Sequence, residues 1–240
     1  MSVFPKHRQE LSDKGFSVIG DLFSGEEVNN ILNAIEAADS NRETFRKTND
    51  LFAIRQFLKE VPAAANLLFT DPLKAVVREL MGENFFVVKS IYFDKPESSN
   101  WYVGYHQDLT ISVNQKRELE GFGPWTNKQS QFAVQPPLNY LENITTIRIH
   151  LDDTDENNGA LKVIPGSHRK QIYRPETINW GEEKEETCSV KRGGIMLMKP
   201  LTLHSSGRTT NGKKRRVIHV EFANAELPAQ IQWAERMELD

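Results

Sequence analysis

The feature that most constrains the fold is a change in sequence character near residue 85. Before it, apolar residues recur at helical spacing, as in Val28, Ile31 and Ile35. After it, short runs of β-branched and aromatic residues are separated by long, irregular connections. Strands and helices do not alternate, which disfavours a parallel, doubly wound sheet. The order predicts a mainly β protein with N-terminal helices packed on a double-stranded β-helix, the cupin-like jelly roll.

Local signals place the first elements. Residues 16–19 have the composition of a short strand. Ser24 and Glu27 fit a capping box that opens a helix. Asp71 is the expected N-cap of a second helix, because Pro72 suits the first helical position.

The remaining N-terminal segments have weaker patterns. Residues 1–14 form a polar lead-in, in which we expect His7 to lie in solvent. Residues 51–69 are expected to be helical, with a break at Pro62. The following segments have strand character: 85–93, 101–113, 145–151, 160–164, 195–203 and 217–222.

We expect one domain over residues 1–240. It comprises a mainly helical part (1–84), the jelly roll (85–224) and a polar tail (225–240) that ends in a short helix. Within the jelly roll, residues 114–143 contain several Gly and Pro residues and are expected to form a lid-like insertion over the substrate. The alternative is a structured insertion that only covers the barrel.

Charge and cysteine usage limit the partners. The formal net charge is −3 and no basic block of the kind that follows a phosphate backbone is present, so nucleic acid is not an expected partner. The polar N-terminus does not resemble a signal peptide, and no apolar run is long enough to span a bilayer. The single cysteine, Cys188, suits a reducing compartment. We therefore expect a cytoplasmic protein without a membrane partner.

Two residues near the middle of the chain have the chemistry of metal ligands. His106 and Asp108 are two positions apart, so they share a face if this segment is a strand. Together they supply two members of a 2-His-1-carboxylate iron site. His204, after an apolar run, is a candidate for the third. The residues alone leave an alternative open, in which these are ordinary polar residues of a surface strand and a half-buried strand end.

A basic run, residues 213–216, enters the final predicted strand. One of its arginines, inside the barrel, would hold a carboxylate with its planar guanidinium. Alternation separates Arg215 from Arg216, but periodicity does not decide which of them faces inward. A solvated basic turn is the alternative.

Several motifs together resemble the phytanoyl-CoA dioxygenase family. The resemblance covers most of the chain and is weakest across 114–143 and after 224. The matching segments are residues 15–19, 24–28, the triplet 106–108, the acidic turn 152–158, Gly-Ala-Leu-Lys-Val-Ile-Pro-Gly-Ser-His at 159–168, residues 199–206, and Arg215, eleven positions after His204.

This resemblance implies an enzyme that uses Fe(II), 2-oxoglutarate and O2 on a double-stranded β-helix. It implies that His106, Asp108 and His204 bind the iron. It also implies that Arg215, selected over Arg216 by the family spacing, binds the distal carboxylate of 2-oxoglutarate together with Ser206. Asp108 favours hydroxylation over halogenation, because related halogenases lack this carboxylate.

The substrate pocket is expected to include Gln107, Trp125 from the lid-like insertion, and Arg148. Arg148 stands where some family members have an aromatic residue, which suggests a more polar pocket for an anionic substrate group. The expected function is hydroxylation of a small molecule. The alternatives are a non-catalytic jelly roll that binds a metal or small ligand, and a peptide or protein hydroxylase. The oligomeric state is not predicted.

Overall fold

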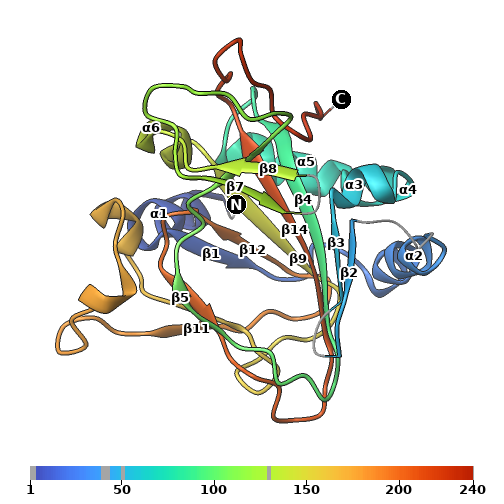
Figure 1. Ribbon diagram of the computed structural model, residues 1–240. Coiled ribbons are helices and arrows are strands. Elements are labelled where there is room, and N and C mark those ends of the chain that lie inside the picture. Colours follow the sequence, from blue (N-terminus) through green and yellow to red (C-terminus); the bar gives the residue numbers. More distant parts are fainter. Residues whose placement is uncertain (1–3, 39–43, 50–51, 129–130, 240) are drawn as a thin grey trace.

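The computed structural model describes residues 4–38, 44–49, 52–128 and 131–239 (Figure 1). The helices of the N-terminal third are α1 (Phe4–Lys14), α2 (Gly25–Glu36), α3 (Phe57–Glu60), α4 (Ala63–Leu68) and α5 (Asp71–Leu80). The later helices are α6 (Leu138–Glu142) and two short 3-10 helices, η1 (Ser167–Lys170) and η2 (Pro175–Thr177). None of the described helices combines the length and apolar character needed to cross a membrane.

Antiparallel strands form three sheets. The seven-stranded sheet has the order β1 (Phe16–Ile19), β12 (Ile195–Met198), β9 (Thr145–His150), β14 (Arg215–Ala223), β4 (Phe86–Lys95), β3 (Phe52–Arg55) and β2 (Phe45–Lys47). The four-stranded sheet has the order β11 (Glu186–Cys188), β10 (Leu161–Val163), β13 (His204–Ser206) and β5 (Val103–His106). The three-stranded sheet has the order β6 (Ile111–Val113), β8 (Gln131–Val134) and β7 (Trp125–Lys128).

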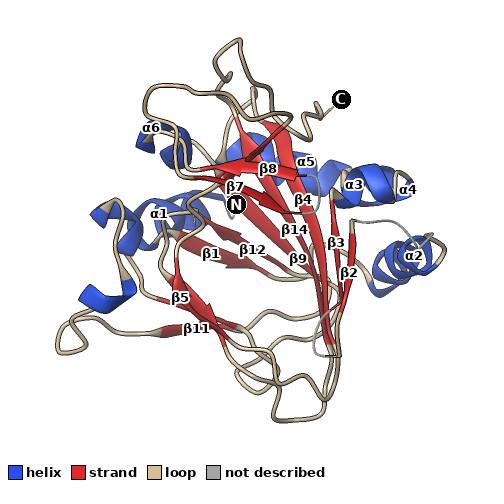
Figure 2. Ribbon diagram, in the orientation of Figure 1, coloured by secondary structure: helices blue, strands red, loops and turns tan. Residues whose placement is uncertain are grey.

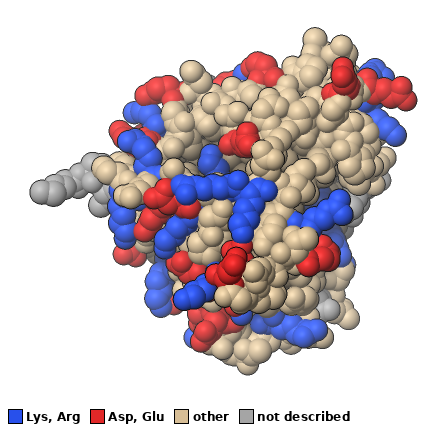
Figure 3. All heavy atoms as spheres, turned by 90° about the vertical axis from the view of Figure 1, so that its left-hand side faces the viewer, with Lys and Arg blue, Asp and Glu red and all other residues tan. Residues whose placement is uncertain are grey.

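The arrangement confirms the predicted jelly roll with helices on one sheet. Helices α2 to α5 cover one face of the seven-stranded sheet, and the strands β5 and β11 lie on its other side (Figures 1 and 2). On the face shown in Figure 3, acidic and basic side chains are interspersed.

The core explains which side chains of β14 face inward. Ile218, Val220 and Phe222 belong to the apolar cluster between the seven-stranded sheet and the helices. The alternate residues of the strand, including Arg215 and His219, therefore face the interior of the jelly roll. Periodicity alone leaves this choice open, and the helices decide it because they require an apolar partner surface.

Helix α2 begins as predicted, with both hydrogen bonds of the capping box between Ser24 and Glu27. Helix α5 has Thr70, not Asp71, as its N-cap, with Pro72 in its first turn. Residues 4–14 are helical, and His7 is buried, with its Nδ1 atom 2.7 Å from Ser17 Oγ. The prediction of a solvated His7 was wrong, because few apolar residues mark the buried face of α1.

Part of the segment predicted as helical forms a strand. Residues 52–55 make up β3, which pairs with β4, whereas α3 and α4 follow on either side of Pro62. Local sequence does not contain this pairing, because the partner strand lies about forty residues further along the chain. The strands β1, β2 and β3 therefore all join the large sheet from within the first 84 residues.

Two predicted strands are interrupted near the potential metal ligands His106, Asp108 and His204. Strand β5 ends at His106 and β6 begins at Ile111, so His106 and Asp108 do not share one continuous strand. Similarly, β12 ends at Met198, and His204 opens β13 instead of closing a strand. The tail forms no helix over the described residues 225–239; Trp233 and Met237 instead make isolated bridges to Val113 and Val87.

Candidate active site

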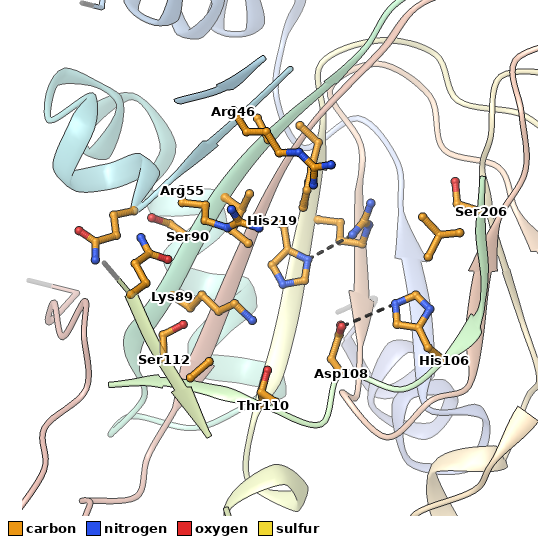
Figure 4. Close-up of a pocket in the computed structure, with 18 of the residues that line it drawn as sticks. Arg46, Arg55, Lys89, Ser90, His106, Asp108, Thr110, Ser112, Ser206 and His219 are labelled. Atoms are coloured by element: carbon orange, nitrogen blue, oxygen red, sulfur yellow. Dashed lines mark hydrogen bonds and ion pairs between the residues drawn. The ribbon is translucent and has the colours of Figure 1, made fainter. Parts of the chain in front are cut away.

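The two histidines and the aspartate meet at one end of the interior cavity. His106 and His204 are register partners at the junction of β5 and β13, and their ring centroids are 4.3 Å apart. Asp108 lies in the loop after β5, where its backbone N–H donates to Pro200 O at 3.0 Å. Its carboxylate oxygens are 3.9 Å from His106 Nε2 and 3.8 Å from His204 Nε2 (Figure 4). One potential ligand atom from each residue thus lies within 4.8 Å of the others.

The backbone fixes the orientation of both imidazole rings. His106 Nδ1 is 2.9 Å from Gly104 O, and His204 Nδ1 is 2.8 Å from Thr202 O. A carbonyl oxygen only accepts hydrogen bonds, so each Nδ1 atom carries the proton. Each Nε2 atom therefore presents a lone pair towards Asp108, which is the tautomer that a metal ligand requires.

The electrostatics of the three residues also suit a cation. Burial opposes ionisation of Asp108, yet the neighbouring His204, His219 and Lys89 hold the pKa of its carboxyl well below the usual range. Burial lowers the pKa of His204 to about 4. The aspartate is therefore ionised and His204 neutral near pH 7, as metal coordination needs.

A buried arginine lies in the same cavity. Arg215 donates to Gly159 O and has Nη1 3.4 Å from Ser206 Oγ. Its Nε atom has no hydrogen-bond partner, and no carboxylate of the described residues forms a salt bridge with it. Burial, followed by the charge of Arg148, lowers the pKa of Arg215 to about 9. An unpaired buried guanidinium is unfavourable, so this position fits a carboxylate supplied by a ligand.

Gly159 makes room for this arrangement. Its φ is +85°, and a Cβ atom there would lie 2.8 Å from both Lys95 Nζ and Gly207 O. Its carbonyl oxygen accepts hydrogen bonds from Arg215 and, at 3.0 Å, from Ser206. The glycine thus allows the backbone to approach and hold the arginine and the serine together.

Arg148 is held beside the three potential ligands by a chain of polar contacts. Its Nη1 atom is 3.2 Å from His219 Nδ1, and His219 Nε2 is 3.0 Å from Glu221 Oε1. Glu221 also accepts a hydrogen bond from Lys89 Nζ at 2.7 Å. His219 therefore donates through Nε2 and accepts at Nδ1. A second group of potential ligand atoms, from Asp108, His219 and Glu221, also lies within 4.8 Å. Arg148 and Lys89 already donate hydrogen bonds to His219 and Glu221 in this second group.

The cavity has a volume of about 440 Å³, and its lining combines charged and polar side chains with apolar ones. It includes six of the residues that the sequence analysis assigned to the site: His106, Asp108, Arg148, His204, Ser206 and Arg215. Further lining residues were not predicted from the sequence: Arg46 and Arg55 from the β2–β3 pair, Lys89 from β4, Thr126 and Gln131 from the three-stranded sheet, and Glu235 from the C-terminal segment.

Two residues assigned to the pocket lie outside its lining. The side chain of Gln107 donates to Gln171 O and Leu201 O and accepts from Tyr173 N–H, so it joins three loops. Trp125 packs against the apolar cluster beneath the three-stranded sheet. Both expectations need correction: Gln107 turns away where β5 ends, and alternation on β7 directs Thr126, not Trp125, to the cavity.

Some of the missed residues have a signal in the sequence. Lys89 is the only charged residue in the apolar run 85–93, and a lone charge in a buried strand indicates a polar partner or a site. Arg46 and Arg55 have no such signal, because their position depends on the pairing of β3 with β4.

A jelly roll that gathers two histidines and one carboxylate at its cavity has the architecture and ligand set of non-haem iron oxygenases. Residues 11–217 match the model of the phytanoyl-CoA dioxygenase (PhyH) family, and the chain belongs to this family. A curated relative from Stutzerimonas stutzeri, a probable alpha-ketoglutarate-dependent hypophosphite dioxygenase, is 26% identical over 93% of this chain and 80% of its own length.

Solved structures share the fold. EctD from S. alaskensis, solved with 2-oxoglutarate and 5-hydroxyectoine, has a TM-score of 0.69 at 19% identity, covering 93% of this chain and 76% of its own. HygX from Streptomyces hygroscopicus, solved with nickel and 2-oxoglutarate, has a TM-score of 0.66 at 16% identity, covering 100% of this chain and 98% of its own. With the family membership and the site, the chain is a non-haem iron dioxygenase that depends on 2-oxoglutarate.

Proposed function

We propose that His106, Asp108 and His204 bind Fe(II), and that Arg215 and Ser206 bind the distal carboxylate of 2-oxoglutarate. The observation that carries this proposal is the meeting, in one cavity, of three potential ligand atoms within 4.8 Å and a buried arginine whose Nε lacks a partner. Neutral nitrogen and anionic oxygen donors suit Fe(II), and a guanidinium suits a carboxylate.

When bound, iron and 2-oxoglutarate together activate O2, and the oxidation yields succinate, CO2 and a hydroxylated product. The protein residues supply position and charge. Asp108 contributes the anionic oxygen donor, and the two carbonyl-bonded histidines contribute fixed Nε2 donors. Arg215 would bind and neutralise the distal carboxylate of 2-oxoglutarate and so orient the co-substrate. The buried surroundings of Arg215 keep water from competing for the guanidinium.

The substrate that we propose is a small molecule with an unactivated C–H bond or an equivalent oxidisable bond. Support comes from the cavity volume of about 440 Å³. The relative from Stutzerimonas stutzeri acts, by its name, on hypophosphite, which is also small. A peptide hydroxylase would need an open groove beside His106, whereas the three-stranded sheet contributes Thr126, Gln131 and Ala133 to the lining of this cavity. We also propose a cytoplasmic location, in keeping with the single, buried cysteine, Cys188.

The first test is succinate formation from 2-oxoglutarate by the iron-loaded protein in air, without substrate and then with hypophosphite. We expect slow turnover in the wild type and at least a hundredfold loss in Asp108→Ala and Arg215→Ala, on the scale of roughly 3 kcal/mol for an unpaired buried charge. Arg216→Ala is the matched control, because this adjacent arginine pairs with Asp152 on the other side of β14.

A second readout separates the enzyme from a binding protein. Anaerobic addition of Fe(II) and 2-oxoglutarate should produce the weak visible absorption of an iron–2-oxo acid chelate in the wild type and in Arg216→Ala. If the wild type showed neither this absorption nor succinate, the non-catalytic jelly roll would be the correct interpretation.

A further inference from the structure

The cavity contains more positive charge than the proposed chemistry uses. Its lining includes five lysine and arginine residues but two acidic residues, Asp108 and Glu235. Of the five cations, Arg215 is assigned to 2-oxoglutarate, and Lys89 donates a hydrogen bond to the carboxylate of Glu221. Arg46, Arg55 and Arg148 also line the cavity and are assigned to neither iron nor co-substrate, whereas Asp108 is assigned to the iron. The cavity lining therefore contains more cationic side chains than iron and 2-oxoglutarate account for.

Three of these cations form one side of the cavity. Arg46 from β2, Arg55 from β3 and Lys89 from β4 come from neighbouring strands, and we call this group the cationic wall. In Figure 4 the cationic wall lies across the cavity from Ser206, and Asp108 lies between the two sides. Burial and the nearby charge of Arg46 both lower the pKa of Arg55, so the two guanidinium groups are close enough to repel each other.

Neither iron nor 2-oxoglutarate accounts for the cationic wall. The co-substrate has two carboxylates, of which one belongs at the metal and the other at Arg215, on the side of Ser206. Lys89 has three donor hydrogens and gives one hydrogen bond to Glu221. Like charges collected in one cavity raise its affinity for anions, and arginine forks match the geometry of oxyanions.

We infer that the cationic wall binds an oxyanion group of the substrate, which makes the natural substrate a small carboxylate or phosphorus oxyanion. The inference rests on the proposed function, and it assigns Arg46 and Arg55 as specificity-determining residues. An anionic group held by the cationic wall places the rest of a small molecule towards Asp108, where oxidation is proposed to occur. Arg148, which also lines the cavity, contacts His219.

The test is calorimetric titration of protein loaded with Mn(II), which does not support turnover. 2-Oxoglutarate is titrated first, and then, in separate experiments, methylphosphonate, acetate and acetamide. Acetate and acetamide have the same shape and differ in charge. We expect both anions to bind at least about tenfold more tightly than acetamide, because hydrogen bonds to charged groups contribute roughly 1.5–3 kcal/mol.

Matched variants locate the binding to the cationic wall. Arg46→Gln and Arg55→Gln should each weaken the binding of the preferred anion about tenfold, whereas Arg55→Lys, which keeps the charge, should retain it within about threefold. Lys47→Gln is the control, because Lys47 is exposed like its neighbour Arg46 on β2 but does not line the cavity. It should leave anion binding unchanged.

Titrating 2-oxoglutarate first separates a failure of the proposed function from a failure of the inference about the cationic wall. If 2-oxoglutarate binds but acetamide equals acetate, or if the Arg55→Gln protein binds anions like the wild type, the cationic wall is not a substrate site and the proposed function stands. If 2-oxoglutarate does not bind, the proposed function fails independently of the anion result. Preference for methylphosphonate would assign a phosphorus oxyanion, and preference for acetate a carboxylate; both support the inference.

Discussion

At the scale of single residues, Glu235 has an unusual position for a carboxyl group. It lies in the C-terminal segment, is 5% exposed, and accepts hydrogen bonds from the backbone N–H of Ser90, at 3.1 Å, and from the Ser90 hydroxyl group. Burial raises its pKa to about 7 from 4.5. Between these two values the folded protein keeps a proton that the unfolded chain releases, so stability falls as the pH rises.

The consequence is a measurable dependence of unfolding on pH. We expect Glu235 to lower the free energy of unfolding by up to about 3 kcal/mol between pH 4.5 and pH 7.5. Glu235→Gln should remove this part of the decline. Urea unfolding of the metal-free proteins at several pH values measures it, with Glu226→Gln, an exposed glutamate of the same segment, as the control. Parallel curves for wild type and Glu235→Gln would contradict the prediction.

The sequence predicts those residues of the candidate site that lie within the motifs of the family. His106, Asp108, His204, Ser206 and Arg215 follow from the family resemblance, and the structure brings them to one cavity. The other lining residues depend on contacts between distant segments. Arg46 and Arg55 reach the cavity because β3 pairs with β4, and Glu235 reaches it because the C-terminal segment crosses to Ser90.

At the scale of elements, strand β7 shows how alternation divides structural from functional side chains. Trp125 packs on the apolar cluster between the three-stranded sheet and the end of the large sheet, and Thr126 lines the cavity. Trp125→Ala should lower the free energy of unfolding by about 2 kcal/mol, less than for a fully buried tryptophan, and leave turnover of 2-oxoglutarate unchanged. Urea unfolding and succinate assays measure both quantities.

The opposite result would support the lid hypothesis for this tryptophan. Wild-type stability combined with altered turnover in Trp125→Ala would mean that Trp125 acts on the cavity through movement of residues 114–143. Thr126→Val, of similar volume, is the comparison that tests the side chain facing the cavity.

Elements with self-contained signals were predicted well, and elements that depend on partners were not. The capping box of α2 holds both of its hydrogen bonds within four residues, so the sequence contains the whole motif. Helix α1 shows few apolar residues, and its burial depends on strand β1 beside it. The sequence predicts a helix where strand β3 forms, because nothing local reveals its pairing with β4.

At the scale of the whole molecule, the proposed ligands join the two larger sheets. The potential metal ligands come from β5, β13 and the loop after β5, whereas Arg215 belongs to β14 in the seven-stranded sheet. Bound iron and 2-oxoglutarate would therefore contact both sides of the jelly roll. A ligand that binds only the folded state stabilises it by about 2.7 kcal/mol at 100 times its Kd.

We accordingly expect the Tm to rise with Mn(II) and to rise again when 2-oxoglutarate is added. Arg215→Ala should keep the first increase and lose the second, and Asp108→Ala should lose both. Differential scanning calorimetry measures these steps, with Arg216→Ala as the control. An undiminished second step in Arg215→Ala would place the distal carboxylate elsewhere in the cavity.

The hydrogen bonds from His106 to Gly104 O and from His204 to Thr202 O have a consequence for how such a protein diversifies. Both rings take their orientation from the main chain two residues earlier, so side-chain replacements nearby leave the donor geometry intact. The cationic wall, in contrast, consists entirely of side chains on neighbouring strands. Mutations in the cationic wall can therefore change which substrate is bound without changing the geometry of His106 and His204. The two sides of the cavity can evolve at different rates.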